Sequence, residues 1–226
     1  MKIRKVLAAG IICCISAQLL CACAEQQTER EDKIYVGVAS YNRSDTFVEE
    51  MIAAFKDKMS DLEEEDIDSV VTIRDAAGSQ RTQNDQVREL INAGCNVLCV
   101  NLVDRADPSE IIDLARESDV PIIFFNREPV AEDLQQWDKM YYVGADAKES
   151  GVMQGEIAAD VIQEDGRIDR NKDGKIQYVV LEGEPGHQDA IIRTENVVDT
   201  LRSRGIKLGK LSYGIANWNR AQAQNR

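Results

Sequence analysis

Short apolar runs alternate with helical patterns along most of this chain. An apolar run of about four to eight residues is typical of a buried strand, and apolar side chains at helical spacing follow each run. Thr46–Met59, for example, places Phe47, Met51 and Phe55 four residues apart. Strands that alternate with helices of this length predict parallel sheets with helices on their faces. The expected fold class is therefore α/β.

One interruption of this alternation predicts two lobes. The first four expected strands are residues 34–40, 69–75, 96–103 and 120–126. Residues 127–139 are polar and read as a connector, after which further strands are expected at residues 140–146, 176–183 and 207–214. We therefore expect sheets of four and three strands, in lobes at residues 34–143 and 144–226. Asp107 and Pro108 predict the start of a helix, as its N-cap and first residue.

The second expected sheet is small, and a new helical pattern begins at Asn219 just before the sequence stops. Open doubly wound sheets usually have about five or six strands. We therefore interpret the chain as an N-terminal fragment whose second lobe is incomplete. Such a fragment is expected to bind ligands weakly and to expose apolar side chains around Val179 and Val180.

Residues 1–22 have the features of a secretory signal. Basic residues precede an apolar run at residues 6–20, which is shorter than the ~20 residues of a membrane span. The following "LCAC" resembles the lipobox of bacterial lipoproteins. This resemblance implies cleavage before Cys23 and lipidation of Cys23, with residues 23–33 as a lipidated tether. We expect an exported protein anchored to a membrane, either in the periplasm or on the outer face of the cell membrane.

The net charge and the cysteine content bear on two questions, whether the chain binds nucleic acid and whether it forms a disulfide. The net charge of -13 argues against a nucleic-acid partner, which requires a basic surface. Apart from the lipidated Cys23, only Cys95 and Cys99 remain in the expected mature chain. About 13 Å of extended strand would separate their Cα atoms, too far for a disulfide. Cys99 is expected to be an ordinary core residue.

Polar and aromatic residues follow several of the expected strands, where open parallel sheets bind ligands. They are Asp45, Phe47, Asn126, Arg127, His187, Asp189, Arg193 and Trp218. Aromatic rings can cover the apolar faces of a sugar ring, and charged or amide groups can bond its hydroxyls. Taken singly, Phe47 could instead pack a helix and Asp45 could only cap one. His187, Asp189 and Asp45 also suggest acid–base hydrolysis, but no nucleophile motif accompanies them, so we expect a binding protein and no enzyme.

The segment "DRNKDGKIQ" begins like a calcium loop. Asp169, Asn171 and Asp173 are followed by Gly174, the opening of an EF-hand. The twelfth position, normally a bidentate glutamate, is Val180 inside an expected strand. An Asp/Asn-rich surface turn is the alternative interpretation.

Several motifs together resemble the galactose/glucose-binding proteins of bacterial ABC importers, which are type 1 periplasmic binding proteins. They include "YNRSDTF", "FFNREP", "YYVGADAKESG", "DRNKDGKIQ" and "LEGEPGHQDA". The resemblance implies two α/β lobes joined by a hinge that close on one hexose. The implied sugar contacts are Asp45, Asn126, His187, Asp189 and Arg193, with Phe47 and Trp218 sandwiching the ring.

The resemblance also implies a calcium ion and a set of partners. The implied Ca²⁺ ligands are the side chains of Asp169, Asn171, Asp173 and Gln177 and the carbonyl of Lys175. A glutamate from a later strand, here beyond Arg226, would complete the set. The implied partners are D-galactose or D-glucose and an ABC permease, and we expect a monomer. The alternative is a sugar sensor that presents its ligand to a chemoreceptor or sensor kinase. A sugar-responsive repressor would instead need an N-terminal helix-turn-helix, where this chain has its secretion signal.

Overall fold

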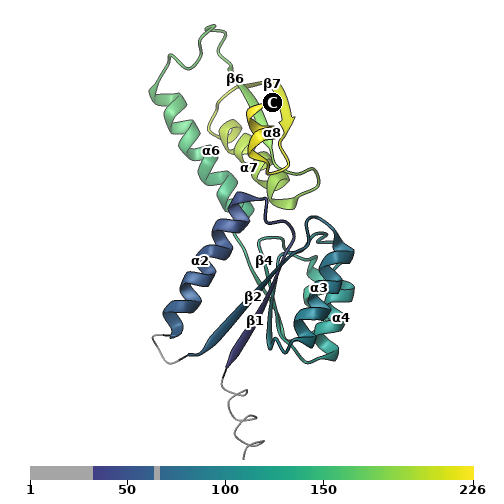
Figure 1. The fold of residues 1–226 in the computed structure, drawn as a ribbon. Coiled ribbons are helices and arrows are strands. Elements are labelled where there is room, and N and C mark those ends of the chain that lie inside the picture. The colour runs from purple at the N-terminus through teal and green to yellow at the C-terminus, as the bar shows by residue number, and fades with distance from the viewer. Residues whose placement is uncertain (1–32, 64–66) are drawn as a thin grey trace, which may run out of the picture. The chain divides into compact units, whose positions relative to one another are not determined.

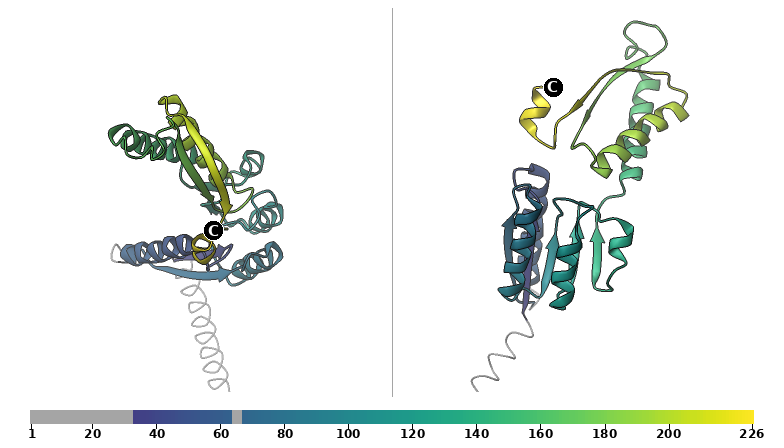
Figure 2. Two further views of the ribbon diagram at one scale, coloured as in Figure 1. Left: turned by 90° about the horizontal axis from the view of Figure 1, so that it is seen from above. Right: turned by 90° about the vertical axis from the view of Figure 1, so that its right-hand side faces the viewer.

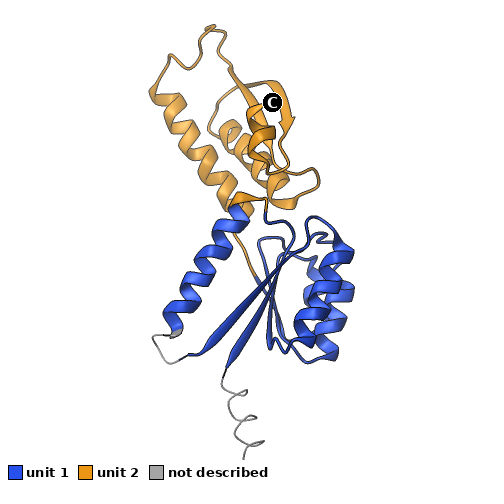
Figure 3. Ribbon diagram, in the orientation of Figure 1, with its two compact units in different colours: residues 1–43, 47–142 blue, residues 44–46, 143–226 orange. Residues whose placement is uncertain are grey.

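The computed structural model describes residues 33–63 and 67–226, in which strands and helices alternate (Figure 1). The chain forms two compact units (Figure 3). The described parts of unit 1 are residues 33–43, 47–63 and 67–142, and unit 2 comprises residues 44–46 and 143–226. The predicted signal, Cys23 and most of the predicted tether lie outside the described residues.

Unit 1 is built on a five-stranded sheet with the order β2-β1-β3-β4-β5. Its strands are β1 (Ile34–Ser40), β2 (Ser69–Asp75), β3 (Val97–Val100), β4 (Ile122–Phe125) and β5 (Met140–Val143). β1 pairs in parallel with β2 and β3, and β3 pairs in parallel with β4. The carboxyl ends of these four strands therefore lie at the same edge of the sheet.

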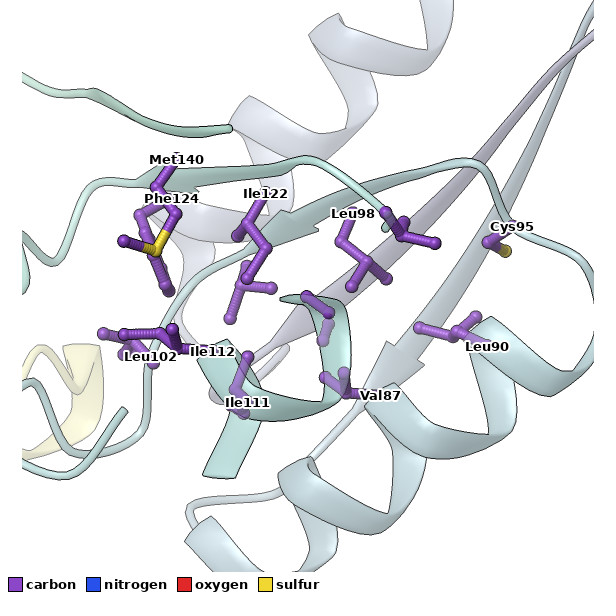
Figure 4. Packing of buried hydrophobic residues seen from close by; sticks show 14 residues of the cluster. Val87, Leu90, Cys95, Leu98, Leu102, Ile111, Ile112, Ile122, Phe124 and Met140 are labelled. Atoms are coloured by element: carbon purple, nitrogen blue, oxygen red, sulfur yellow. The ribbon is translucent and has the colours of Figure 1, made fainter. Parts of the chain in front are cut away.

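Helices cover both faces of the unit 1 sheet, with α2 on one face and α3 and α4 on the other (Figure 1). Their bounds are α2 (Thr46–Glu63), α3 (Gln80–Asn92) and α4 (Ser109–Glu117). Each face has its own core cluster. The cluster beside α3 and α4 includes Leu98, Ile111, Ile122 and Phe124, all with 0% exposure (Figure 4). The cluster beside α2 includes Val38, Val48 and Ile52.

The two described cysteines lie in different clusters of unit 1. Cys95 belongs to the cluster beside α3 and α4, and Cys99 to the cluster beside α2. Both are free thiols, which confirms the prediction that they form no disulfide. Burial raises the pKa of the Cys99 thiol to about 11, so Cys99 is a neutral core side chain.

Unit 2 has a parallel two-stranded sheet of β6 and β7, which lie side by side in Figure 2. Its elements are α6 (Ala147–Glu164), β6 (Ile176–Glu182), α7 (Gln188–Ser203), β7 (Leu208–Ile215) and α8 (Arg220–Gln224). α6 packs closely on α7 through the buried stripe Gly151, Gly155 and Ala159. The expected exposure of apolar side chains is confirmed for Val179, which is 63% exposed, whereas Val180 is half-buried.

The sheet assignment of one strand is a correction. The sequence predicts that residues 140–146 begin the second sheet, and this prediction is wrong because β5 joins the first sheet beside β4. The Ile122 N–H donates to the Lys139 carbonyl at 3.0 Å where the two segments meet. The described sheets therefore have five and two strands instead of four and three.

Three local predictions are also corrected. The expected connector at residues 127–139 contains a short helix, α5 (Ala131–Leu134). α2 continues to Glu63, beyond the expected helical pattern that ends at Met59, because glutamate is a good helix former. α4 begins at Ser109 with Pro108 as its N-cap residue and no side-chain cap bond, so Asp107 is not the cap.

Candidate functional site

Two asparagines follow neighbouring strands at the carboxyl edge of unit 1. Asn101 comes directly after β3 and is fully buried, and Asn126 comes directly after β4. Asn101 Nδ2 donates to the Phe125 carbonyl and to Asn126 Oδ1, each at 3.1 Å. Asn126 has φ 62°, a left-handed conformation that asparagine tolerates. The Tyr142 hydroxyl donates to the Asn126 carbonyl oxygen at 3.2 Å.

Asn101 is the residue that sequence reasoning misses. Its Oδ1 is buried and accepts no hydrogen bond from any residue that the structure describes. A buried acceptor without a donor is costly in a folded protein, so this oxygen indicates a position where a ligand donor or a water belongs. The available signal was an asparagine directly after the apolar run "VLCV", matching Asn126 directly after "IIFF".

The predicted residues at the start of α2 and directly after Asn126 differ in exposure. Phe47, in the first turn of α2, is 65% exposed. Asp45 directly precedes α2 and is half-buried. Arg127 is buried, with its guanidinium 3.8 Å from the centre of the Tyr41 ring, and donates to the Val103 carbonyl at 3.0 Å. Arg127 therefore supports this edge from inside the unit.

In unit 2, His187 and Trp218 follow the carboxyl ends of β6 and β7. Their ring centroids are 5.2 Å apart, with an edge-to-face angle of 77°. Asn217 and Trp218 have φ 48° and 55°, a costly conformation for a bulky side chain. The turn is held because the Asn217 N–H donates to the Gly183 carbonyl at 2.9 Å.

Gly183 leaves the space that the Trp218 ring occupies. A Cβ atom at position 183 would lie 2.2–2.4 Å from three atoms of the indole. Any other residue there would displace the ring. Gly183 is buried and directly follows β6, so a glycine in "LEGEPGH" sets the position of an aromatic residue 35 positions later.

A charged pair begins α7 next to these rings. Asp189 lies in the first turn of α7, and its carboxylate is 3.5 Å from Arg193 Nη2. The Asp189 side chain is only 15% exposed. Arg193 Nε is buried without a hydrogen-bond partner among the described residues. The pair therefore offers both acceptors and a donor at the carboxyl end of β6.

A cavity of about 470 Å³ in unit 2 runs between β6 and the helices α6 and α7. Arg193, Glu182 and Trp218 line it together with mainly apolar side chains of the two helices and β6. Glu182 is the last residue of β6, so part of this polar lining lies at the carboxyl end of that strand. Apolar side chains make up most of the remaining lining.

The predicted calcium loop lies between α6 and β6. Gly174 N–H donates to Asp169 Oδ2 at 2.9 Å, and Lys175 N–H donates to Asp173 Oδ1 at 2.9 Å. This backbone hydrogen bond from Lys175 is the main cause of a lowered pKa at Asp173. Gln177 Nε2 and Asn171 Nδ2 also donate to Asp173. Val180 lies inside β6, which confirms that the twelfth position belongs to a strand.

Asp169 has one carboxylate oxygen that remains available. Its Oδ1 is buried and has no hydrogen-bond partner in the part of the chain that the structure describes. The loop supplies two carboxylates, two amides and a carbonyl, all of them oxygen ligands suited to a hard cation. Within residues 33–63 and 67–226, no three His, Cys, Asp or Glu side chains gather as a metal site. A cation here would therefore depend on amide and carbonyl oxygens as well as carboxylates.

Both units place polar and aromatic side chains at the carboxyl ends of parallel strands. This arrangement defines a class of α/β ligand-binding protein. The chain belongs to the periplasmic binding protein family, because the family's domain model matches residues 36–226. No helix among the described residues is both long and apolar enough to cross a bilayer.

One curated relative is a D-galactose/methyl-galactoside binding periplasmic protein of Haemophilus influenzae. It is 38% identical over 192 residues, which are 84% of this chain and 56% of the relative. A putative rhizopine-binding protein of Rhizobium meliloti is 30% identical over 66% of this chain and 45% of that protein. The chain thus spans about half the length of these curated relatives. Both are named as binding proteins, not as enzymes.

Solved structures show the same fold at low sequence identity. An ABC transporter solute-binding protein of Actinobacillus succinogenes with bound D-allose has a TM-score of 0.66 at 19% identity, covering 85% of this chain and 62% of that one. The fructose-binding periplasmic domain of a hybrid two-component system has a TM-score of 0.58 at 22% identity, covering 85% of this chain and 57% of the other.

Proposed function

We propose that this chain binds a hexose, D-galactose or D-glucose, for an ABC permease. The observation that carries the proposal is that each unit has both aromatic rings and hydrogen-bonding groups near the carboxyl ends of its parallel strands. Unit 1 supplies Asn101 and Asn126, with Phe47 at the start of α2. Unit 2 supplies His187, Asp189, Arg193 and Trp218. Asp45, which directly precedes α2 and belongs to unit 2, is also a proposed contact. The galactose-binding relative supports a hexose as the ligand.

The chemistry of these groups suits a sugar hydroxyl rim. Asn101 Oδ1 accepts from a hydroxyl, and Arg193 Nε donates to one. Charge-assisted bonds from Asp189 and Arg193 are the stronger ones. The indole of Trp218 covers an apolar ring face. A site with unsatisfied buried polar groups rejects sugars that lack the matching hydroxyl.

Replacing Trp218 by alanine is expected to weaken D-galactose binding by about 1–2 kcal/mol, a factor of about 5 to 30. Two-dimensional NMR with increasing galactose measures this affinity even when it is weak. The matched control is Leu211→Ala, because Leu211 is 69% exposed on β7 and lies outside the proposed contacts. Equal dissociation constants for parent and Trp218→Ala would remove this residue from the site, and a parent spectrum unchanged by hexoses would reject the proposed function.

The second candidate function is sensing. The fructose-binding domain of a two-component system has the same fold, so the fold serves both tasks. Co-purification decides between them: a permease that is retained by the hexose-loaded protein supports import, and a sensor kinase or chemoreceptor supports sensing.

We also propose that the loop at residues 169–177 binds Ca²⁺. Asp169, Asn171, Asp173 and Gln177 would hold the ion with their side chains, and Lys175 with its carbonyl. The buried Oδ1 of Asp169, which has no hydrogen-bond partner among the described residues, supports this assignment. The ion would neutralise the two carboxylates where the chain enters β6.

Calcium is expected to raise the melting temperature of the parent, since binding at about a hundred times the Kd stabilises by about 2.7 kcal/mol. Asp169→Ala should lose most of this shift, because it removes the carboxylate with the available oxygen. Asp165→Ala is the control, since Asp165 pairs with Arg167 just before the loop. An equal shift in Asp169→Ala, measured by calorimetry, would argue against the site.

We propose that Cys23 is lipidated and anchors the exported chain to a membrane. The support is the "LCAC" segment after a short apolar run, and stable anchoring usually needs more than one acyl chain. Cys23→Ser is expected to move the protein from the membrane fraction to the soluble fraction. Continued processing and membrane retention of Cys23→Ser would contradict the proposal.

A further inference from the structure

Gln83 is a fully buried polar residue of α3 whose amide bonds to the backbone of unit 1 strand ends. Its exposure is 0%. Nε2 donates to the Asn101 carbonyl at 2.8 Å and to the Ala39 carbonyl at 3.3 Å. Oε1 accepts from the Val103 N–H at 2.9 Å. Both ends of the amide are therefore satisfied, as a buried polar side chain requires.

These contacts fix the backbone on both sides of the Asn101 side chain. The carbonyl of Asn101 and the N–H of Val103 are held by one amide. The N–H of Asn101 donates to the Ala39 carbonyl at 3.0 Å, so Gln83 and Asn101 share that acceptor at the end of β1. The segment after β3 is thus tied to α3 and to β1.

The orientation of the Asn101 carboxamide follows from this anchoring. Asn101 Nδ2 donates to the Phe125 carbonyl and to Asn126 Oδ1. Asn101 Oδ1 is then the acceptor that has no hydrogen-bond partner among the described residues. We propose that Gln83 is a positioning residue of the sugar site, which holds Asn101 so that Oδ1 meets a sugar hydroxyl. This inference rests on the proposed hexose contact of Asn101.

A purely structural role for Gln83 makes a different prediction. In that case Gln83 only satisfies buried backbone groups, and its loss lowers stability without a specific effect through Asn101. A positioning role requires that the two residues be coupled in ligand binding. Residues in one hydrogen-bond network show such coupling, whereas independent residues act additively.

The test is a double-mutant cycle on the whole chain with Gln83→Met, Asn101→Ala and the double variant. The dissociation constant for D-galactose comes from the same NMR titration. We expect Gln83→Met to weaken binding about tenfold in the parent and less than about twofold in the Asn101→Ala background. Asn101→Ala alone is expected to weaken binding at least as much as Gln83→Met.

The matched control is Val87→Ala, one turn further along α3. Val87 is also fully buried, but it belongs to the apolar cluster. Val87→Ala should lower the melting temperature while the dissociation constant stays within about twofold of the parent. If Gln83→Met does not fold, Gln83→Glu keeps the acceptor for the Val103 N–H and removes the amide donor to Asn101, and it enters the same cycle.

The outcomes separate the two proposals. Additive losses in the double variant overturn the positioning role while hexose binding by the parent stands. Unchanged binding in Asn101→Ala overturns the Asn101 contact and the positioning role with it. A parent that binds no hexose overturns the proposed function together with this inference.

Discussion

Phe124→Ala is expected to destabilise unit 1 by about 3–5 kcal/mol, the usual cost of removing a fully buried phenylalanine. Phe124 lies in β4 with 0% exposure and contributes to the core cluster beside α3 and α4. The lost transfer energy and the cavity left behind act together, because the short strand β4 lies between β3 and β5 and has little room to collapse.

Urea unfolding followed by circular dichroism measures this loss. Val70→Ala is the control, because Val70 lies on the edge strand β2 and is 40% exposed. The control should lose less than about 1 kcal/mol. A loss below about 1 kcal/mol in Phe124→Ala would contradict the tight packing of this cluster.

Gly155→Ala is expected to destabilise unit 2 by about 1–3 kcal/mol, the range typical of overpacking. Helix propensity alone favours alanine over glycine by about 1 kcal/mol. Here, however, an added Cβ would lie 2.6 Å from Thr200 Cβ and 3.0 Å from the Val197 carbonyl oxygen. The clash is with a β-branched side chain and with backbone, neither of which yields easily, so the steric cost wins.

Helix propensity and the steric clash predict opposite changes in stability for Gly155→Ala, so the sign of the measured change decides between them. Gly166→Ala serves as the control, since nothing lies within 4 Å of its added Cβ, and its effect should stay within about 0.5 kcal/mol. Thermal unfolding of the three proteins gives the comparison. An increase in stability on Gly155→Ala would show that α6 and α7 do not approach as closely as the structure indicates.

Local sequence patterns predict the order of elements well. The strands at residues 34–40 and 69–75 match the structure at both ends, because an apolar run between polar turns is a local property. The same reasoning placed Asn126, His187 and Trp218 after strands, where the structure has them. Whether they contact a sugar stays a prediction.

Features that depend on distant pairings were not predictable in this way. The partner of β5 is set by backbone hydrogen bonds to β4, and hydropathy carries no signal for such a choice. The backbone of Asn101 is hydrogen-bonded by Gln83, which the sequence alone shows only as one more polar helix residue. The Trp218 ring fits where it does because Gly183 has no Cβ atom. This contact forms only once β6 and β7 are paired.

The placement of the two tryptophans gives each unit its own optical probe. Trp137 packs against the core cluster of unit 1, and Trp218 lies against Gly183 and the His187 ring in unit 2. Because the chain has only these two tryptophans, Trp137→Phe and Trp218→Phe each leave a single tryptophan as the probe. Fluorescence melts of the two variants then report the unfolding of one unit at a time, and coincident transitions would mean that the units unfold as one cooperative system.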